Sequence, residues 1–158
     1  MTQLSEKYCL AILITNLKHR KRYPDPITVA DCAKYLADSY GSFQQVAETV
    51  GVHPSVIRKW VGLATAPKKL REYVKEGKIF PVAAFAILSA FPEESKRIEV
   101  VEEVAGWGEP EIIRLIHCMK NNPNLSASEC RELVIAGALR QMAIDNGIET
   151  NRKEDLHH

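Results

Sequence analysis

Four side chains that can donate hydrogen bonds or carry positive charge lie between residues 53 and 59: His53, Ser55, Arg58 and Lys59. Arginine and lysine bind phosphate, and arginine can also pair bidentately with guanine in the major groove of DNA. Serine and histidine add shorter hydrogen-bonding groups beside them. These residue types suit non-covalent recognition of a duplex. No carboxylate pair, nucleophile motif or glycine-rich phosphate loop surrounds them, so catalysis is not predicted.

The spacing around these residues predicts two short helices joined by a tight turn, with the cationic side chains facing outward. Ala47 lies four residues before Gly51, and Ile57 lies six residues after it, which is the spacing of a DNA-binding helix-turn-helix. Gly51 can end the first helix with a positive φ angle, and Pro54 suits the first turn of the second. Ile57 and Trp60 are three residues apart and should face inward. An ordinary αα-hairpin is the alternative interpretation.

A second group of basic residues follows this segment. No acidic residue occurs between Glu48 and Glu72, whereas Arg58, Lys59, Lys68, Lys69 and Arg71 all lie in that interval. Pro67 should open a helix that carries Lys68 and Lys69 in its first turn, where positive charge opposes the helix dipole. Local stability therefore does not explain these two lysines, which favours an external anion. A solvated run of charge is the alternative.

The end of the first predicted helix is also basic, and it has two interpretations. Cations near a helix C-terminus are favourable in themselves, but the same side chains could contact the phosphates of an adjoining stretch of DNA. The predicted DNA-contacting residues are therefore Gln44, Gln45, His53, Pro54, Ser55, Arg58, Lys59, Lys68, Lys69, Arg71, Arg20, Lys21 and Arg22.

Length and composition predict one globular domain, or one domain with an arm. The chain has 158 residues, a hydrophobic content of 46% and a net charge of +1 at pH 7. No run approaches the roughly 18 apolar residues of a membrane span, and no secretory signal is predicted, so we expect a cytoplasmic protein that does not engage membranes. Residues 1–91 hold 13 Lys and Arg against 7 Asp and Glu, whereas residues 92–158 hold 8 against 13. A basic half suits a polyanionic partner; chance clustering is the alternative.

The cysteines and histidines predict neither a metal site nor a catalytic site. Cys9, Cys32, Cys118 and Cys130 form no C-x-x-C pair, and no histidine pair has zinc-finger spacing. Buried free thiols are therefore expected, with no metal and no cofactor. The histidines are scattered, so we expect that the protein is not an enzyme.

Helical periodicity and capping residues predict an all-α protein. We expect a helix over residues 5–20, a second helix capped by Thr28, a third capped by Ser42, and a recognition helix over residues 54–61. The predicted organisation is an N-terminal helix and basic linker (1–26), a helix-turn-helix DNA-binding domain (27–122), a C-terminal helix (123–147) and a disordered tail (148–158).

Three later helices carry more specific expectations. The helix that Pro81 opens is apolar all round and should be central, and in the next helix Ile98, Val101 and Val104 should face inward. Ser126 with Glu129 three residues later predicts a capping box at the last helix. Small residues in that helix, Ala136, Gly137 and Ala138, would let a second helix approach closely. The first and last helices are thus candidate homodimer surfaces, although packing within the chain explains the small residues as well.

From Ser42 to about Lys120 the chain resembles the DNA-binding domain of the ParB family of partition proteins, including its KorB and Noc relatives. The segments that carry the resemblance are Val46-Ala47 with Gly51 and Ile57, Trp60-Val61-Gly62-Leu63, Ala66-Pro67-Lys68-Lys69-Leu70, Val74 to Ile79, Ala83 to Leu88, and Glu109 to Ile116. The family's nucleotide-binding domain has no counterpart among the 41 residues before Ser42, so a CTP-switched clamp is not predicted. The family's histidine and arginine in the apolar helix are here Ala83 and Phe85.

The resemblance implies a sequence-specific double-stranded DNA-binding protein, in chromosome or plasmid partition or in transcriptional regulation. Its implied partners are double-stranded DNA and a partition ATPase, and its implied location is the nucleoid. A single helix-turn-helix of this size usually binds DNA as a dimer on a palindrome, so a second copy of the chain is also expected. The alternative is an all-helical protein–protein adaptor in which the helix-turn-helix is only a scaffold.

Overall fold

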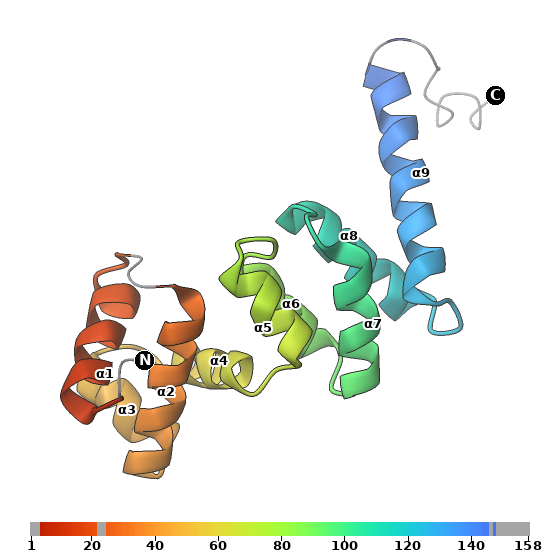
Figure 1. The fold of residues 1–158 in the computed structure, drawn as a ribbon. Coiled ribbons are helices and arrows are strands. Elements are labelled where there is room, and N and C mark those ends of the chain that lie inside the picture. Colours follow the sequence, from red (N-terminus) through yellow and green to blue (C-terminus); the bar gives the residue numbers. More distant parts are fainter. Residues whose placement is uncertain (1–3, 22–24, 146, 148–158) are drawn as a thin grey trace. The chain divides into compact units, whose positions relative to one another are not determined.

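The computed structural model describes residues 4–21, 25–145 and 147, and within these residues the protein is helical, with no β-strand (Figure 1). The predicted all-α class is therefore confirmed. The elements are α1 (Glu6–Leu13), the π-helical stretch η1 (Ile14–Lys18), α2 (Pro26–Tyr40), α3 (Phe43–Val50), α4 (Pro54–Ala64), α5 (Lys68–Lys75), α6 (Pro81–Ala90), α7 (Glu94–Val104), α8 (Glu109–Asn121) and α9 (Ala127–Asp145). No helix in this described part of the chain is long and apolar enough to cross a membrane.

The chain divides into two compact units, Met1–Glu109 and Pro110–His158. We call them the N-terminal unit, which contains α1 to α7, and the C-terminal unit, which contains α9 and all of α8 beyond its first residue. The predicted boundaries after residues 26 and 122 remain predictions. Arg22 and the predicted disordered tail over residues 148–158 lie outside the described residues.

The first predicted helix is shorter than expected and changes its geometry part of the way along. Ser5 caps α1 by accepting a hydrogen bond from the Tyr8 N–H at 3.2 Å, and the regular α-helix ends at Leu13. The π-helical stretch then continues to Lys18. Arg20 has a φ angle of 55°, in the left-handed region that ends helices. The helical stretch thus begins one residue later and ends two residues earlier than the predicted range of 5–20, and the prediction missed its π-helical part.

The helix α2 begins earlier than predicted, because Asp25 and not Thr28 is its N-cap. One carboxylate oxygen of Asp25 accepts from the N–H groups of Ile27 and Thr28 at 2.9 and 3.1 Å. Pro26 occupies the first helical position, where its missing N–H is not needed. Pro26 therefore opens the helix, and the expectation of a Thr28 cap was wrong.

The core of the N-terminal unit lies where α1, α2, α3 and α4 meet; α2 packs against the other three, and α3 packs against α4. Buried side chains from these four helices form one cluster: Cys9, Ile12, Leu13, Val29, Cys32, Ala33, Leu36, Val46, Ala47, Val50 and Ile57. Cys9, Cys32 and Cys130 are buried free thiols, as predicted, whereas Cys118 is only partly buried. Burial raises the pKa of the Cys9 and Cys32 thiols, which keeps both protonated at neutral pH.

The helix α6 is less central than its apolar sequence predicted. It packs against α4, α5 and α7, and it buries Ala83, Ala84 and Ile87. Val82, however, is 55% exposed, because no other described part of the chain covers that side of the helix. The expectation that the whole helix is internal was therefore wrong on one side.

The inward face of α7 differs from the prediction at one position. Val100, Val101 and Val104 are buried, but Ile98 is 38% exposed. Arg97 is partly buried instead, and its guanidinium donates to the carbonyl oxygens of Leu88 and Phe91. These carbonyls lie at the C-terminal end of α6, where helix carbonyls lack partners within the helix. Arg97, whose guanidinium donates to these carbonyls, therefore faces inward where the prediction had Ile98 facing inward.

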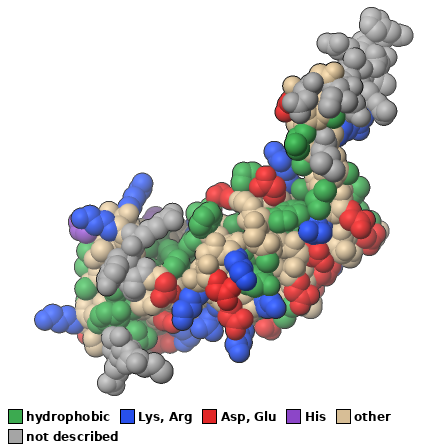
Figure 2. Space-filling model, turned by 45° about the horizontal axis from the view of Figure 1, so that its top comes forward, with side chains coloured by type: hydrophobic (Ala, Val, Ile, Leu, Met, Phe, Trp, Pro, Cys, Tyr) green, Lys and Arg blue, Asp and Glu red, His purple; other side chains and the backbone are tan. Residues whose placement is uncertain are grey.

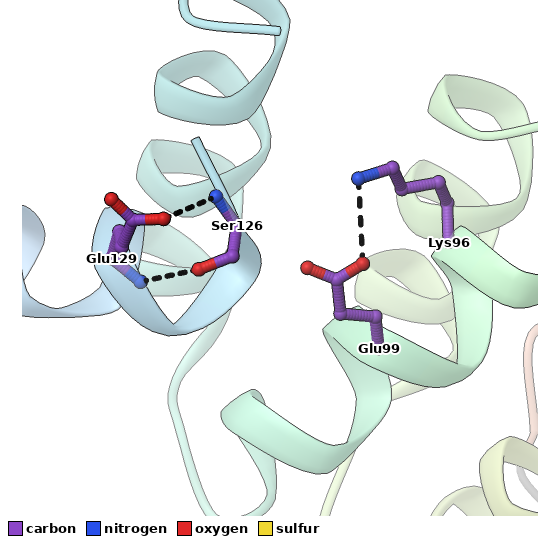
Figure 3. Close-up of polar contacts among 4 residues, drawn as sticks. All are labelled: Lys96, Glu99, Ser126 and Glu129. Carbon is purple, nitrogen blue, oxygen red and sulfur yellow. Dashed lines mark hydrogen bonds and ion pairs between the residues drawn. The ribbon is translucent and has the colours of Figure 1, made fainter. Parts of the chain in front are cut away.

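In the C-terminal unit the predicted capping box is confirmed (Figure 3). The Ser126 N–H donates to the Glu129 carboxylate at 3.2 Å, and the Glu129 N–H donates to the Ser126 hydroxyl at 3.1 Å. The buried residues of α9, Ala127 and Cys130, both lie at its beginning. Beyond them the described side chains of α9 are half-buried or exposed.

Candidate nucleic-acid interface

The turn between α3 and α4 has the local structure that the sequence predicted. Ser42 caps α3 by accepting from the Gln45 N–H at 3.1 Å. Gly51 ends the helix with a φ angle of 90°, and its N–H donates to the Ala47 carbonyl at 2.8 Å. Pro54 occupies the first turn of α4. Ala47 is 1% exposed and Ile57 is fully buried, so the small residue and the aliphatic anchor both lie in the core.

The opposite side of α4 faces solvent and carries positive charge. Ser55, Arg58 and Lys59 are exposed, and they share one side of the helix with Gly62, since residues three, four and seven apart lie above one another. We call Ser55, Arg58, Lys59 and Gly62 the cationic flank. The helix continues to Ala64, three residues beyond the predicted end, so this flank is longer than expected.

The buried side of α4 is fixed at two points. Ile57 belongs to the core cluster of the first four helices. Trp60 is partly buried, and its ring meets the ring of Phe85 on α6 edge-on, with 5.1 Å between centroids and 79° between planes. Both inward predictions agree with this packing. Because α4 is held both by the core of the first four helices and by α6, its exposed flank has a fixed orientation within the N-terminal unit.

Arg58 and Lys59 keep their charges available. The Arg58 guanidinium lies 5.9 Å from the centroid of the Phe43 ring on α3, a cation–π arrangement that supports the side chain without neutralising it. Neither residue forms an ion pair with a carboxylate among the residues that the structure describes. An anionic ligand would therefore not have to displace an internal partner from either side chain.

His53 and Ser55 are joined to each other at the start of α4. The Ser55 N–H donates to Nδ1 of His53 at 3.1 Å, and the Ser55 hydroxyl lies 2.8 Å from the same nitrogen. His53 is thus the N-cap residue of the helix. Both side chains are exposed, but each has a structural role at the helix terminus as well as a predicted role in DNA contact.

The two predicted glutamines lie on the first turn of α3 and are exposed. The Gln44 side-chain amide donates to the Glu48 carboxylate at 2.8 Å. For Gln45, it is the backbone carbonyl that accepts from the Thr49 hydroxyl, at 2.9 Å. Gln45 therefore keeps its side-chain amide free of any internal hydrogen bond that the structure describes, whereas Gln44 is engaged along its own helix.

The cations at the start of α5 have local contacts that the sequence interpretation did not include. Lys68 lies 3.8 Å from the Glu72 carboxylate one turn later, and its side chain is 88% exposed. The Lys69 ammonium lies 5.5 Å from the centroid of the Tyr73 ring. Exposed contacts of these kinds contribute little to stability, so neither lysine is immobilised and both can reach an anion.

Arg71 differs from its two neighbours, because it is partly buried and faces α2. Its charge lowers the pKa of Asp31, although burial has the larger effect and raises that pKa overall. The Arg71 Nε atom is buried without a hydrogen-bond partner in the described structure. Of the three basic residues predicted on α5, Arg71 thus has the strongest structural role.

The basic end of η1 reaches the helix turn. A Cβ atom added at Gly51 would lie 3.2 Å from the Lys18 ammonium nitrogen and 3.3 Å from its Cδ, so the Lys18 side chain covers this glycine. Arg20 and Lys21 follow and are exposed. The contact brings the N-terminal basic cluster to the turn that precedes α4.

Two residues of this surface, Phe43 and Gly62, were not among the predicted contacts, whereas Lys18 belongs to the basic helix end that was already a candidate for phosphate contact. Gly62 lies one residue beyond the predicted end of the recognition helix, so its position on the exposed side of α4 was not foreseen; a Cβ atom there would meet nothing within 4 Å. Phe43 had no sequence signal, because its role depends on its contact with Arg58 on a different helix.

No protein-family model matches the chain, and no curated protein or solved structure matches it either. No cluster of three or more His, Cys, Asp or Glu side chains that could hold a metal ion occurs among the described residues. The interpretation of the surface therefore depends on its own geometry and charge.

Proposed function

We propose that the protein is a sequence-specific double-stranded DNA-binding protein of the ParB/KorB type, in chromosome or plasmid partition or in transcriptional regulation. In this proposal α3 and α4 form a helix-turn-helix, and α4 enters the major groove. Duplex DNA is the partner, at the nucleoid, and no cofactor takes part. A second copy of the chain and a partition ATPase are further partners in the proposal.

One observation carries the proposal: a short helix that is buried through Ile57 presents Ser55, Arg58 and Lys59 to solvent. The two cations have no carboxylate partner among the described residues, and no acid occurs in the sequence between Glu48 and Glu72. A rigid helix with cationic and hydrogen-bonding side chains along one side suits base edges and phosphates.

The cations divide into two roles. Arg58 and Lys59, with Ser55, are proposed to contact bases, and Arg58 is the candidate for a bidentate bond to guanine. Lys68 and Lys69 are proposed to hold phosphates, joined by Lys18, Arg20 and Lys21. Arg71 is a weaker candidate for phosphate contact, since its charge also serves the partly buried Asp31.

The proposal predicts a strong dependence of affinity on salt. With about five phosphate contacts, the slope of log affinity against log salt concentration should be roughly −4 to −5. Fluorescence anisotropy with a labelled duplex measures it, after binding-site selection from random DNA has supplied a target sequence. A flat dependence, or a failure to enrich any sequence, would contradict the proposal.

A double variant tests whether the cationic flank makes the contacts. Arg58→Ala with Lys59→Ala should weaken binding to the selected duplex by one to two powers of ten, on the order of what lost base and phosphate contacts remove. Lys7→Ala with Arg114→Ala removes two other exposed cations and should change affinity much less. Thermal unfolding of both variants should match that of the parent protein, because all four side chains are exposed.

A protein-binding adaptor is the second candidate, favoured by exposed apolar side chains at the start of α6. Phe80 is 58% exposed and Val82 is 55% exposed, and exposed apolar patches are typical of protein contacts. Green hydrophobic side chains also reach the surface between the charged ones in Figure 2. Retention of full DNA affinity by the Arg58 and Lys59 double variant would favour this adaptor function, as would the absence of any duplex binding by the parent.

A further inference from the structure

Beyond its first turns, α9 has an apolar surface that the described part of the chain leaves exposed. The sequence from residue 133 to residue 139 is Leu-Val-Ile-Ala-Gly-Ala-Leu, with no polar residue. Leu133 is 54% exposed and Met142 is 59% exposed, while the buried residues of the helix, Ala127 and Cys130, both precede this run. A helix that is apolar all round is normally covered all round, so this segment requires a partner surface.

One side of α9 carries an ordered set of residues that we call the α9 stripe: Glu129, Leu133, Ala136 and Arg140. They follow one another at intervals of four, three and four residues, which is the spacing of a helix that packs along a second helix. At about 100° per residue, the stripe lies opposite Ala127, Val134 and Ala138, which are buried or half-buried. All four residues of the stripe are exposed, so they are available to a partner surface.

The α9 stripe is complementary to itself when it is reversed. It begins with a carboxylate and ends with a guanidinium, and the large Leu133 and the small Ala136 lie between them. Two copies that pack antiparallel would set Glu129 against Arg140 of the second copy, and Leu133 against Ala136 of the second copy. Two-fold symmetry makes each contact twice. A parallel pair would instead place like charges together at both ends.

Gly137 supports a close approach by another helix. A Cβ atom at this position would meet nothing within 4 Å, so packing within the chain does not require glycine there. Glycine is also among the poorest residues in a helix interior. Because Gly137 has no side chain and lies next to Ala136, however, the backbone of a second helix can approach α9 closely beside the stripe.

From the charge complementarity of the stripe, we propose that α9 is the interface of an antiparallel homodimer and that its occupant is α9 of a second copy. The stripe also fixes the register, with Leu133 of each copy over Ala136 of the other. This proposal is independent of DNA binding, and it specifies which of the two candidate dimer surfaces is used.

Sedimentation equilibrium of the full chain over a range of concentrations tests the interface. We expect a reversible monomer–dimer equilibrium. Leu133→Gln should weaken it by about tenfold or more, since it removes apolar burial at two symmetric contacts. Ile135→Gln is the matched control; Ile135 is 37% exposed, but it projects away from the stripe and should leave the equilibrium unchanged.

A charge reversal tests the orientation. Arg140→Glu should weaken the antiparallel dimer by about tenfold, because it sets two carboxylates together at each end. In a parallel pair, by contrast, the two Arg140 side chains already lie together, so the variant would replace one like-charge contact with another. Arg114→Glu is the control, with the same charge change at an exposed position of α8. Adding Glu129→Arg to Arg140→Glu should restore dimerisation, provided that circular dichroism shows α9 intact without its capping-box carboxylate.

Three outcomes would overturn the proposal. The parent chain could remain a monomer at all concentrations, extended or with α9 folded back onto its own chain. A dimer could form that neither Leu133→Gln nor Arg140→Glu weakens, which would assign the interface to another surface. Finally, Arg140→Glu alone could have no effect, which would exclude the antiparallel register. Duplex selection and the salt dependence of binding can be measured on a monomeric chain as well as on a dimer, so the two proposals can fail separately.

Discussion

The helices α4 and α9 both present an exposed side with a glycine in the helix interior, but they are held in very different ways. On α4 the opposite side is buried through Ile57, and the exposed side is cationic. On α9 the residues beyond Cys130 are half-buried or exposed wherever they are described, and the exposed surface is largely apolar. Gly62 and Gly137 both have open space where a Cβ atom would lie.

This difference indicates two kinds of partner. A charged flank on a fixed helix is stable in water without a ligand, so its charges are available for a polyanion at little cost in folding. An apolar helix surface is unfavourable in water until something covers it. The first arrangement suits reversible binding of DNA, and the second suits association with another protein surface.

The largest expected effect separates the anchored helix from the unanchored one. Ile57→Ala should lower the free energy of unfolding by about 2 to 5 kcal/mol, because it opens a cavity in the core of the N-terminal unit. Leu133→Ala, on exposed α9, should change it by less than about 0.5 kcal/mol in the monomer. Urea titrations at low protein concentration, followed by circular dichroism, measure both. Equal losses would show that α9 is as firmly packed as α4, and the contrast between the two helices would be lost.

The next effect concerns the turn that sets the direction of α4. Gly51 and Gly41 both have positive φ angles, of 90° and 82°, so alanine at either site should lower the free energy of unfolding by about 1 to 2 kcal/mol through backbone strain. Only at Gly51 would the new Cβ also press on Lys18, at 3.2 Å. Gly51→Ala should therefore be the more destabilising of the two in thermal unfolding. If the two losses were equal, the Lys18 contact would have no energetic role.

The sequence predicted best those features that depend on neighbours a few residues away. The Ser42 cap, the Gly51 helix end and the Ser126 capping box are local hydrogen-bonding patterns, and all three were correct. The Asp25 cap was missed because the side chain of Thr28 can also cap a helix, whereas α2 begins at Pro26, directly after Asp25. The π-helical stretch had no local signal, since its residues are compatible with an ordinary α-helix.

Features that depend on distant contacts could not be read from the sequence in the same way. Arg71 was assigned to phosphate contact by its place in a basic run, but the packing of α5 on α2 brings its charge to Asp31. Arg97 took the inward position expected for Ile98 because the end of α6 supplies carbonyl acceptors. In both cases the partner lies on another helix, and periodicity within one helix cannot reveal it.

A smaller effect compares the N-caps of the two helices. His53→Ala removes the acceptor for the Ser55 N–H, and Ser126→Ala removes the acceptor for the Glu129 N–H; each should cost about 1 kcal/mol of helix stability. Because α4 is anchored, His53→Ala should lower the unfolding temperature of the N-terminal unit without loss of helix content at 25 °C. Ser126→Ala should instead reduce the helical circular dichroism signal of α9. Reversed outcomes would show that α9, and not α4, is held by tertiary packing.

The smallest effect on stability separates the proposed partners most clearly. Gly62→Ala and Gly137→Ala should each raise the free energy of unfolding by about 0.5 to 1 kcal/mol, because alanine is the better helix former and each new methyl group meets open space. If the duplex approaches the cationic flank closely, the methyl group at residue 62 should weaken DNA binding while the protein becomes more stable. At protein concentrations at which the chain is monomeric, Gly137→Ala should leave DNA affinity unchanged, which makes it the matched control. Anisotropy titrations at a fixed salt concentration, paired with urea unfolding of the same samples, measure both quantities. Unchanged affinity in Gly62→Ala would mean that DNA does not come close to α4 near residue 62, and the proposed docking of α4 in the major groove would have to be abandoned.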